Sequence, residues 1–241
     1  MRIIIIGNSH VGALKRAWDQ LKDSYIGIEI YFVAAASDLI KNLEIHGNKI
    51  LTQNSLLNEN IKLTFGNYEI DYKKLNPDVC LFYGMNMGCP SRFIRRSTLG
   101  NFTKHFVNNA MNDYFSSHAW GYEIAEMISL KFKGNFYASH PIASSHDIKL
   151  ETFSDESYEW VSNAVSYFNK ILIKKNIKYF IQPYKTFHPS RYQTFLEFSI
   201  NSQRLGIEDG PDAKKHPNND FTHMNNKFGT VFLESFINEI S

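Results

Sequence analysis

The sequence predicts an α/β protein, a three-layer α/β/α sandwich whose mostly parallel sheet has about five strands. Short apolar runs alternate along the chain with longer segments of helical periodicity, which is the pattern of consecutive strand–helix units. Several runs end in polar or glycine-containing corners, and no repeat, low-complexity tract or linker divides the 241 residues. We therefore expect a single domain over residues 1–241.

The chain opens on an apolar strand, a polar corner and a helix. Residues 2–6 read RIIII, and such a run is typical of a strand buried on both faces of a parallel sheet. After the corner GNSH, one face of a helix carries apolar residues at helical spacing: Val11, Leu14, Trp18 and Leu21. Ser9 thus lies between a strand end and a helix start, where backbone N–H groups commonly hold phosphates or reactive groups.

Four further strands follow, each a short apolar run bounded by turn residues. They are predicted at residues 28–33, 79–83, 136–139 and 178–181. Two later helices carry apolar residues on one face: Tyr158, Val161, Val165, Phe168 and Leu172 in the first, and Phe228, Val231, Phe232 and Phe236 in the last. Because the carboxyl ends of parallel strands meet at one edge, we expect the loops 7–12, 34–38 and 84–90 to surround a ligand site.

Two insertions lengthen this plan, at about residues 38–75 and 89–133. Residues 38–60 have no clear period and are expected to be helical or irregular, whereas 89–133 should be mainly helical. Residues 61–72, IKLTFGNYEIDY, alternate apolar and polar side chains on both sides of Gly66, which predicts a hairpin.

Composition excludes several classes of protein. With 43% hydrophobic and 21% charged residues the chain has no bias towards disorder, and its net charge of +2 gives no reason to expect a nucleic-acid or membrane partner. Cys80 and Cys89 fit neither a disulfide framework nor a metal-ligand spacing, and Cys80 is expected to be buried. The apolar start is too short for a secretory signal, and no stretch approaches the roughly 20 apolar residues of a membrane span. We therefore expect a cytoplasmic protein without a metal or cofactor.

The corner GNSHVGAL has two chemical interpretations. Gly7 and Gly12 have the spacing of a phosphate loop, but its lysine and its hydroxyl residue are replaced by Ala13 and Leu14. The dinucleotide fingerprint also fails, because Ser9 stands at its second glycine. The alternative is that Ser9 is a nucleophile.

A nucleophilic serine requires a base, which is usually a histidine oriented by a carboxylate. His223 lies in NNDFTHMNNKFG, shortly before the last helix, and Asp220 precedes it by three residues. This spacing on a turn can point both side chains the same way, so that the carboxylate meets the imidazole N–H. The alternative is that Asp220 caps the helix and His223 is a surface residue, in which case His188 or His216 would be the base.

Three short motifs together resemble the SGNH, or GDSL-type, hydrolase superfamily. They are GNSH at 7–10, GMN at 84–86 and DFTH at 220–223, in the order in which the family carries its motifs. The first two follow strands and the third precedes the last helix, as in the family. The resemblance spans the chain, leaves the two insertions unexplained, and implies a flavodoxin-like fold and a serine esterase.

The resemblance also implies a role for each matching residue. Ser9 would attack an acyl carbonyl, His223 would accept its proton, and Asp220 would orient His223. The oxyanion hole would use the backbone N–H of Ser9, the side-chain amide of Asn86 and a backbone N–H at Ala36. The implied substrate is an O-acyl ester, expected to be an O-acetyl ester, of a small molecule or a carbohydrate.

Two positions depart from the family's motifs. Asn8 replaces the usual aspartate, which is not a reacting group. The segment AAAS at 34–37 lacks the glycine that normally donates an N–H; Ala36 or Ser37 would replace it, with strain if the backbone needs a conformation open only to glycine. Because of this departure, an alternative interpretation is that the chain is an inactive glycan- or nucleotide-binding module. An O-acyltransferase that uses the same triad also remains open, because it shares the acyl-enzyme.

Three further residues are predicted beside the substrate. His10 follows the nucleophile and either lines the pocket or only begins the helix, while Gly84 opens the second motif. Arg92, in RFIRR, would meet an anionic substrate or else lie on a solvated helix face. His140 ends the fourth predicted strand either beside the site or as a plain strand stop. The sequence does not indicate an oligomeric state.

Overall fold

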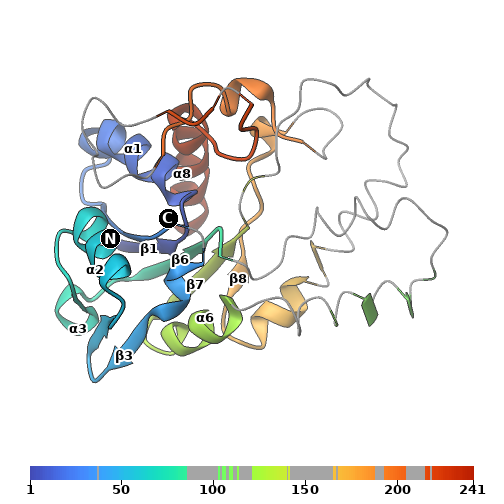
Figure 1. The fold of residues 1–241 in the computed structure, drawn as a ribbon. Helices are drawn as coiled ribbons and strands as arrows, with labels where there is room; N and C mark the ends of the chain where they lie inside the picture. The colour runs from blue at the N-terminus through green and yellow to red at the C-terminus, as the bar shows by residue number, and fades with distance from the viewer. Residues whose placement is uncertain are drawn as a thin grey trace.

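A five-stranded parallel sheet forms the centre of the part of the chain that is described (Figure 1). The computed structural model describes residues 1–36, 38–85, 121–139, 168–187, 193–204 and 219–241, and the separate positions 103, 105, 106, 109, 110, 113, 141, 165, 166 and 215–217. The five strands are β1 (Arg2–Gly7), β2 (Glu29–Ala34), β6 (Val79–Tyr83), β7 (Gly134–Ala138) and β8 (Lys178–Tyr179).

The spatial order of these strands is β2-β1-β6-β7-β8, which is the flavodoxin-like order. The order reverses between β1 and β6, whose last paired residues are Gly7 and Tyr83. At such a switch point the chain leaves the two neighbouring strands towards opposite faces, which opens a crevice at their carboxyl ends. The residues that follow β1 and β6 therefore flank the expected ligand position.

Helices cover both faces of the sheet (Figure 1). The helices α1 (Val11–Leu21) and α8 (Asn226–Ile240) pack on one face, and α2 (Ser55–Phe65) and α6 (Gly121–Ser129) on the other. Strand β1 contributes to both cores: Ile3 and Ile5 face α1 and α8, whereas Ile4 and Ile6 face the opposite layer. This follows from the alternation of side chains along a strand. The predicted three-layer arrangement is confirmed.

The five predicted strands of the parallel sheet, and the helices predicted after the first strand and at the end of the chain, agree with the structure apart from their ends. Strand β6 has the predicted bounds, β7 begins earlier than predicted and β8 is shorter. In α8 the predicted inner residues Phe228, Phe232 and Phe236 are buried. Of the helix predicted around 158–172, the described positions are helical, and Phe168 and Leu172 are buried. Cys80 is buried, as expected.

The hairpin predicted over 61–72 is wrong, because its first half belongs to α2. Asn54 caps this helix by accepting a hydrogen bond from the Leu57 N–H at 3.0 Å, and Gly66 ends it with φ 90°. Buried residues recur at helical spacing, and Thr64 Oγ1 accepts a hydrogen bond from the Ala34 N–H of β2 at 3.2 Å. Packing against β2 therefore outweighs the local alternation of apolar residues.

The first insertion also contains a small antiparallel sheet that the sequence did not predict. It is built from β3 (Glu44–His46), β4 (Lys49–Leu51) and β5 (Ile70–Asp71), and α3 (Tyr72–Leu75) follows it. The described residues also form four short 3₁₀ turns, η1 (Lys22–Ser24), η2 (Leu39–Asn42), η3 (Tyr184–Thr186) and η4 (Leu196–Phe198). Among the described helices, none has the length and apolar character needed to cross a membrane.

Candidate active site

Ser9 lies on the corner between β1 and α1, at the switch point of the sheet. Gly7, the last residue of β1, needs to be a glycine, because a Cβ there would lie 1.9 Å from the Tyr83 carbonyl oxygen of β6. After the strand, the Val11 N–H donates to Asn8 O at 3.0 Å and the Gly12 N–H to Ser9 O at 3.1 Å. These bonds start the helix directly after the corner and present the Ser9 side chain at the carboxyl edge of the sheet.

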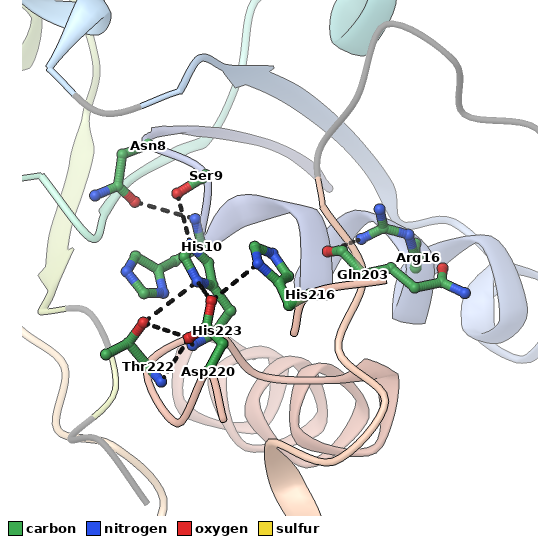
Figure 2. A network of polar contacts seen from close by, with 9 residues as sticks. All are labelled: Asn8, Ser9, His10, Arg16, Gln203, His216, Asp220, Thr222 and His223. Carbon is green, nitrogen blue, oxygen red and sulfur yellow. Dashed lines mark hydrogen bonds and ion pairs between the residues drawn. The ribbon is translucent and has the colours of Figure 1, made fainter. Parts of the chain in front are cut away.

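The three residues of the predicted triad are in contact (Figure 2). Ser9 Oγ lies 3.1 Å from His223 Nε2, and His223 Nδ1 lies 2.8 Å from Asp220 Oδ2. An ionised carboxylate only accepts hydrogen bonds, so Nδ1 of His223 carries the proton that faces Asp220. In neutral His223 the other ring nitrogen is then an acceptor, and the Ser9 hydroxyl donates to it. The geometry is that of a serine whose proton can pass to a histidine.

The carboxylate of Asp220 is held by a dense set of donors. Its Oδ1 accepts hydrogen bonds from the Thr222 hydroxyl at 2.7 Å, the Thr222 N–H at 2.9 Å and the His223 N–H at 3.2 Å. Burial raises the pKa of the Asp220 carboxyl, but the hydrogen bonds from Thr222 and His223 outweigh it and place the pKa below its ordinary value. Asp220 is therefore ionised at neutral pH and can stabilise a positive charge on His223.

The turn that carries Asp220 and His223 is fixed at the start of α8. Asn225 caps this helix by accepting a hydrogen bond from the Phe228 N–H at 3.2 Å. Its Nδ2 donates to the carbonyls of Glu197 at 2.7 Å and Ile200 at 2.8 Å, and its own N–H donates to Phe198 O at 2.7 Å. One asparagine thus joins the turn, the helix and the segment around η4.

Two further histidines lie against His223 (Figure 2). The His10 ring stacks on it with centroids 4.7 Å apart, and the His216 ring with centroids 3.9 Å apart. His10 also occupies the N-cap position of α1, as one of the two interpretations expected, and its contact with substrate stays a prediction. His216 was predicted only as an alternative base, and the structure instead places its Nδ1 2.9 Å from Asp220 Oδ2. The spacing of four residues between His216 and Asp220 is the one sequence signal for this contact.

Two of the three predicted oxyanion donors, Ser9 and Ala36, belong to the described residues. Among the described residues, nothing accepts a hydrogen bond from the Ser9 N–H. The Ala35 N–H donates to Gly7 O at 3.2 Å, so Ala36 follows β2 at the same edge as the corner. Ala36 has no positive φ, and the strain considered for a replaced glycine is absent there. Ser37 lies outside the described residues.

Gly84 and Met85 are fixed where the third strand of the sheet ends. The Gly84 N–H donates to Ala138 O at 2.9 Å, and its φ of +66° is one that favours glycine. Its carbonyl accepts a hydrogen bond from Asn8 Nδ2 at 2.5 Å, and the Met85 carbonyl accepts one from the Tyr137 hydroxyl at 3.1 Å. Asn8 therefore joins the first motif to the second, a role that the sequence did not indicate. Asn86, Arg92, His140 and His188 lie outside the described residues.

Within the described chain, one group of side chains has the donor spacing of a metal site, namely His216, Asp220 and His223, whose ligand atoms lie within 4.8 Å of one another. The planes of the two imidazole rings differ by only 12°. In this structure His216 Nδ1 and His223 Nδ1 both lie at hydrogen-bond distance from Asp220 Oδ2, at 2.9 and 2.8 Å, and these contacts account for the spacing of the three ligand atoms.

No protein-family model matches this sequence, and no curated protein matches it either. Among solved structures, the chain is similar to the periplasmic domain of a lipopolysaccharide acetyltransferase from Salmonella ser. Paratyphi A, with a TM-score of 0.46 and 16% identity over 99% of this chain and 83% of that chain. It is also similar to a gut microbial diltiazem-metabolizing enzyme, with a TM-score of 0.44 and 11% identity over 98% of this chain and 46% of that chain.

Proposed function

We propose that this protein is a serine esterase of the SGNH type that forms an acyl-enzyme on Ser9. The observation that carries the proposal is the continuous contact from Ser9 Oγ to His223 Nε2 at 3.1 Å and from His223 Nδ1 to Asp220 Oδ2 at 2.8 Å. This chain of contacts lies at the carboxyl edge of a parallel sheet, where its switch point opens a ligand site. Nucleophile, base and orienting carboxylate are the components that acyl transfer requires.

In the first half-reaction Ser9 Oγ attacks the ester carbonyl carbon while its proton passes to His223 Nε2. The carbonyl oxygen becomes an oxyanion, which the Ser9 N–H, an N–H at Ala36 and the Asn86 amide would stabilise. When this intermediate collapses, the alcohol leaves with the proton from His223. Water then repeats the same steps on the acyl-enzyme, releases the acid and restores the Ser9 hydroxyl.

Asp220 fixes the tautomer of His223 and compensates its positive charge during this cycle. Its carboxylate accepts the Nδ1 proton of His223, which fixes the tautomer that presents Nε2 to Ser9. When His223 becomes an imidazolium, the ionised carboxylate compensates its charge. The lowered pKa of Asp220 means that this negative charge is available throughout the neutral range.

The proposed substrate is an O-acyl ester, in the first instance an O-acetyl ester, of a small molecule or a carbohydrate. This assignment rests on the resemblance to the SGNH hydrolases that the motifs GNSH, GMN and DFTH carry. The same acyl-enzyme would give an O-acyltransferase if an acceptor alcohol replaced water in the second half-reaction. Acetate release from acetylated sugars, measured with and without acceptor alcohols, distinguishes the two reactions.

Covalent labelling tests the proposal directly. A fluorophosphonate probe should modify Ser9, as located by mass spectrometry, and labelling should disappear in Ser9→Ala and fall strongly in His223→Ala. Ser235→Ala and His46→Ala are matched controls, because Ser235 Oγ donates to Val231 O within α8 and His46 is an exposed partner of Glu44. Folded wild-type protein that is not labelled at Ser9 would rule out the esterase.

A further inference from the structure

A histidine outside the proposed triad contacts both members of the Asp220–His223 pair. His216 Nδ1 lies 2.9 Å from Asp220 Oδ2, the same oxygen that His223 Nδ1 approaches at 2.8 Å. The His216 ring also stacks on His223 with an interplanar angle of 12°. Its side chain is only 8% exposed. One buried ring therefore touches the carboxylate and a face of the proposed base.

His216 is neutral in the range in which a serine esterase works. Burial lowers its pKa to about 4, and the charges of His223, Arg204 and Arg16 act in the same direction against the attraction of Asp220. A neutral imidazole has one N–H, and a bare nitrogen facing a carboxylate oxygen at 2.9 Å would be repelled. The proton therefore belongs on Nδ1, where it faces Asp220. Nε2 is buried without a hydrogen-bond partner among the described residues.

Hydrogen bonds that start at Arg16 of helix α1 hold the backbone around His216 in place. Arg16, on that helix, donates from Nη1 to the Gln203 carbonyl at 3.2 Å. Gln203 pairs with Lys215 in an isolated bridge, and the His216 N–H donates to Ser202 O at 2.9 Å. Figure 2 shows Arg16 and Gln203 on the side of His216 that faces away from His223. The ring is therefore held by the helix that begins at the nucleophile.

We propose that His216 is a positioning residue for the triad, holding the Asp220 carboxylate and the plane of the His223 ring so that Nε2 stays directed at Ser9. The inference rests on the proposed function and deepens it. His216 transfers no proton itself. A neutral ring suits this role, because it restricts the rotation of His223 without adding a charge that would oppose the imidazolium. With His10 against the other side, the base is confined while it switches from proton acceptor to proton donor.

Three substitutions separate the two contacts of His216. His216→Asn keeps an N–H donor near the place of Nδ1 but loses the stacked ring, His216→Phe keeps the ring but loses the donor, and His216→Ala loses both. We expect His216→Ala to lower kcat on an acetyl ester by about 10²-fold, the effect of a misplacement of about 1 Å. KM should change little, because the contacts of this buried side chain are with Asp220 and His223. His216→Asn and His216→Phe should each recover part of the lost kcat, and His46→Ala should match wild type.

Fluorophosphonate labelling of the same variants distinguishes a failure of this inference from a failure of the proposed function. If wild type is labelled at Ser9 and all three folded variants are labelled at the wild-type rate, His216 does not position the triad. A raised KM with unchanged kcat would also overturn the inference, because it would make His216 a substrate contact. If His216→Ala does not fold, the other two variants decide. Wild type that is not labelled at Ser9 contradicts the esterase itself.

Discussion

Gly229 of α8 packs directly against the backbone of Ala13 of α1. A Cβ on Gly229 would lie 2.2 Å from the Ala13 carbonyl oxygen and 2.8 Å from the Cβ of Ala17. Both helices begin at the candidate site, since Ser9 precedes α1 and His223 precedes α8. This glycine contact therefore sets how closely the proposed nucleophile and its base can approach.

Replacing Gly229 with alanine should force the two helices apart. Overpacking of this kind costs about 1–3 kcal/mol, and the shift should also lengthen the contact between Ser9 and His223. Urea unfolding would measure the loss of stability, and the rate of fluorophosphonate labelling would measure the effect on the site. Asn238→Ala, at an exposed position of the same helix, is the control. A destabilised Gly229→Ala variant with a normal labelling rate would show that the helix spacing does not control the site.

Asp220→Asn should leave the fold in place and remove most of the activity. An asparagine cannot supply the negative charge that stabilises the imidazolium, and it can reverse the tautomer of His223, so we expect kcat to fall by about 10⁴-fold. Steady-state hydrolysis of an acetyl ester measures the change. Asp19→Asn, which removes an exposed partner of Lys15, should leave kcat unchanged. An Asp220→Asn enzyme with near-normal kcat would mean that the carboxylate does not orient the base.

Asn8→Asp should destabilise the protein, although aspartate is the usual residue at this position in the hydrolases that the sequence motifs resemble. Asn8 Nδ2 donates to Gly84 O at 2.5 Å while its Oδ1 accepts from the His10 N–H at 3.1 Å, so the side chain must be donor and acceptor at once. A carboxylate only accepts, and it would leave the Gly84 carbonyl without its donor at a cost of about 1–3 kcal/mol.

Urea unfolding at neutral and acidic pH would measure this cost. A protonated aspartic acid can donate to Gly84, so the difference from wild type should shrink as the pH falls. Asn54→Asp is the matched control, because the Asn54 side chain accepts the Leu57 N–H at the start of α2 and, within the described chain, donates to nothing, so aspartate is equally suitable there. Equal stability of Asn8→Asp and wild type at neutral pH would contradict the bridging role of the amide.

The free energy of unfolding should decrease when the pH is lowered, because His216 titrates at a lower pH in the folded protein than in the unfolded chain. Burial, with the charges of His223, Arg204 and Arg16, lowers the pKa of His216 from 6.5 to about 4 against the attraction of Asp220. Between these values the unfolded chain binds a proton that the folded state excludes, so the free energy of unfolding decreases as the pH falls from 6.5 to about 4. In His216→Asn this contribution is absent, and its unfolding should depend less steeply on pH in that window. Equal slopes in urea unfolding would show that His216 is not held neutral.

The parallel sheet could be predicted from the sequence because its strands are buried on both faces. Burial on both faces produces continuous apolar runs, as in residues 2–6 and 79–83, and these runs match β1 and β6 closely. The first insertion was harder, since Leu63 and Phe65 alternate as in a strand, whereas the face that α2 buries includes the polar residues Asn60 and Thr64. A helix forms there because Asn54 caps its start, Gly66 ends it and its buried face packs against β2.

In the candidate site, too, some features could be predicted from the sequence and others depend on tertiary packing. The sequence by itself determined which side chains have the chemistry of acyl transfer and which loops carry them, because residue types and strand ends are local properties. Only the tertiary structure decided that Ser9 and His223 touch, since their contact depends on how closely α1 and α8 pack. The same holds for His216, whose place beside Asp220 depends on backbone pairing with residues 202 and 203. Such contacts join segments far apart in the chain, and local periodicity cannot predict them.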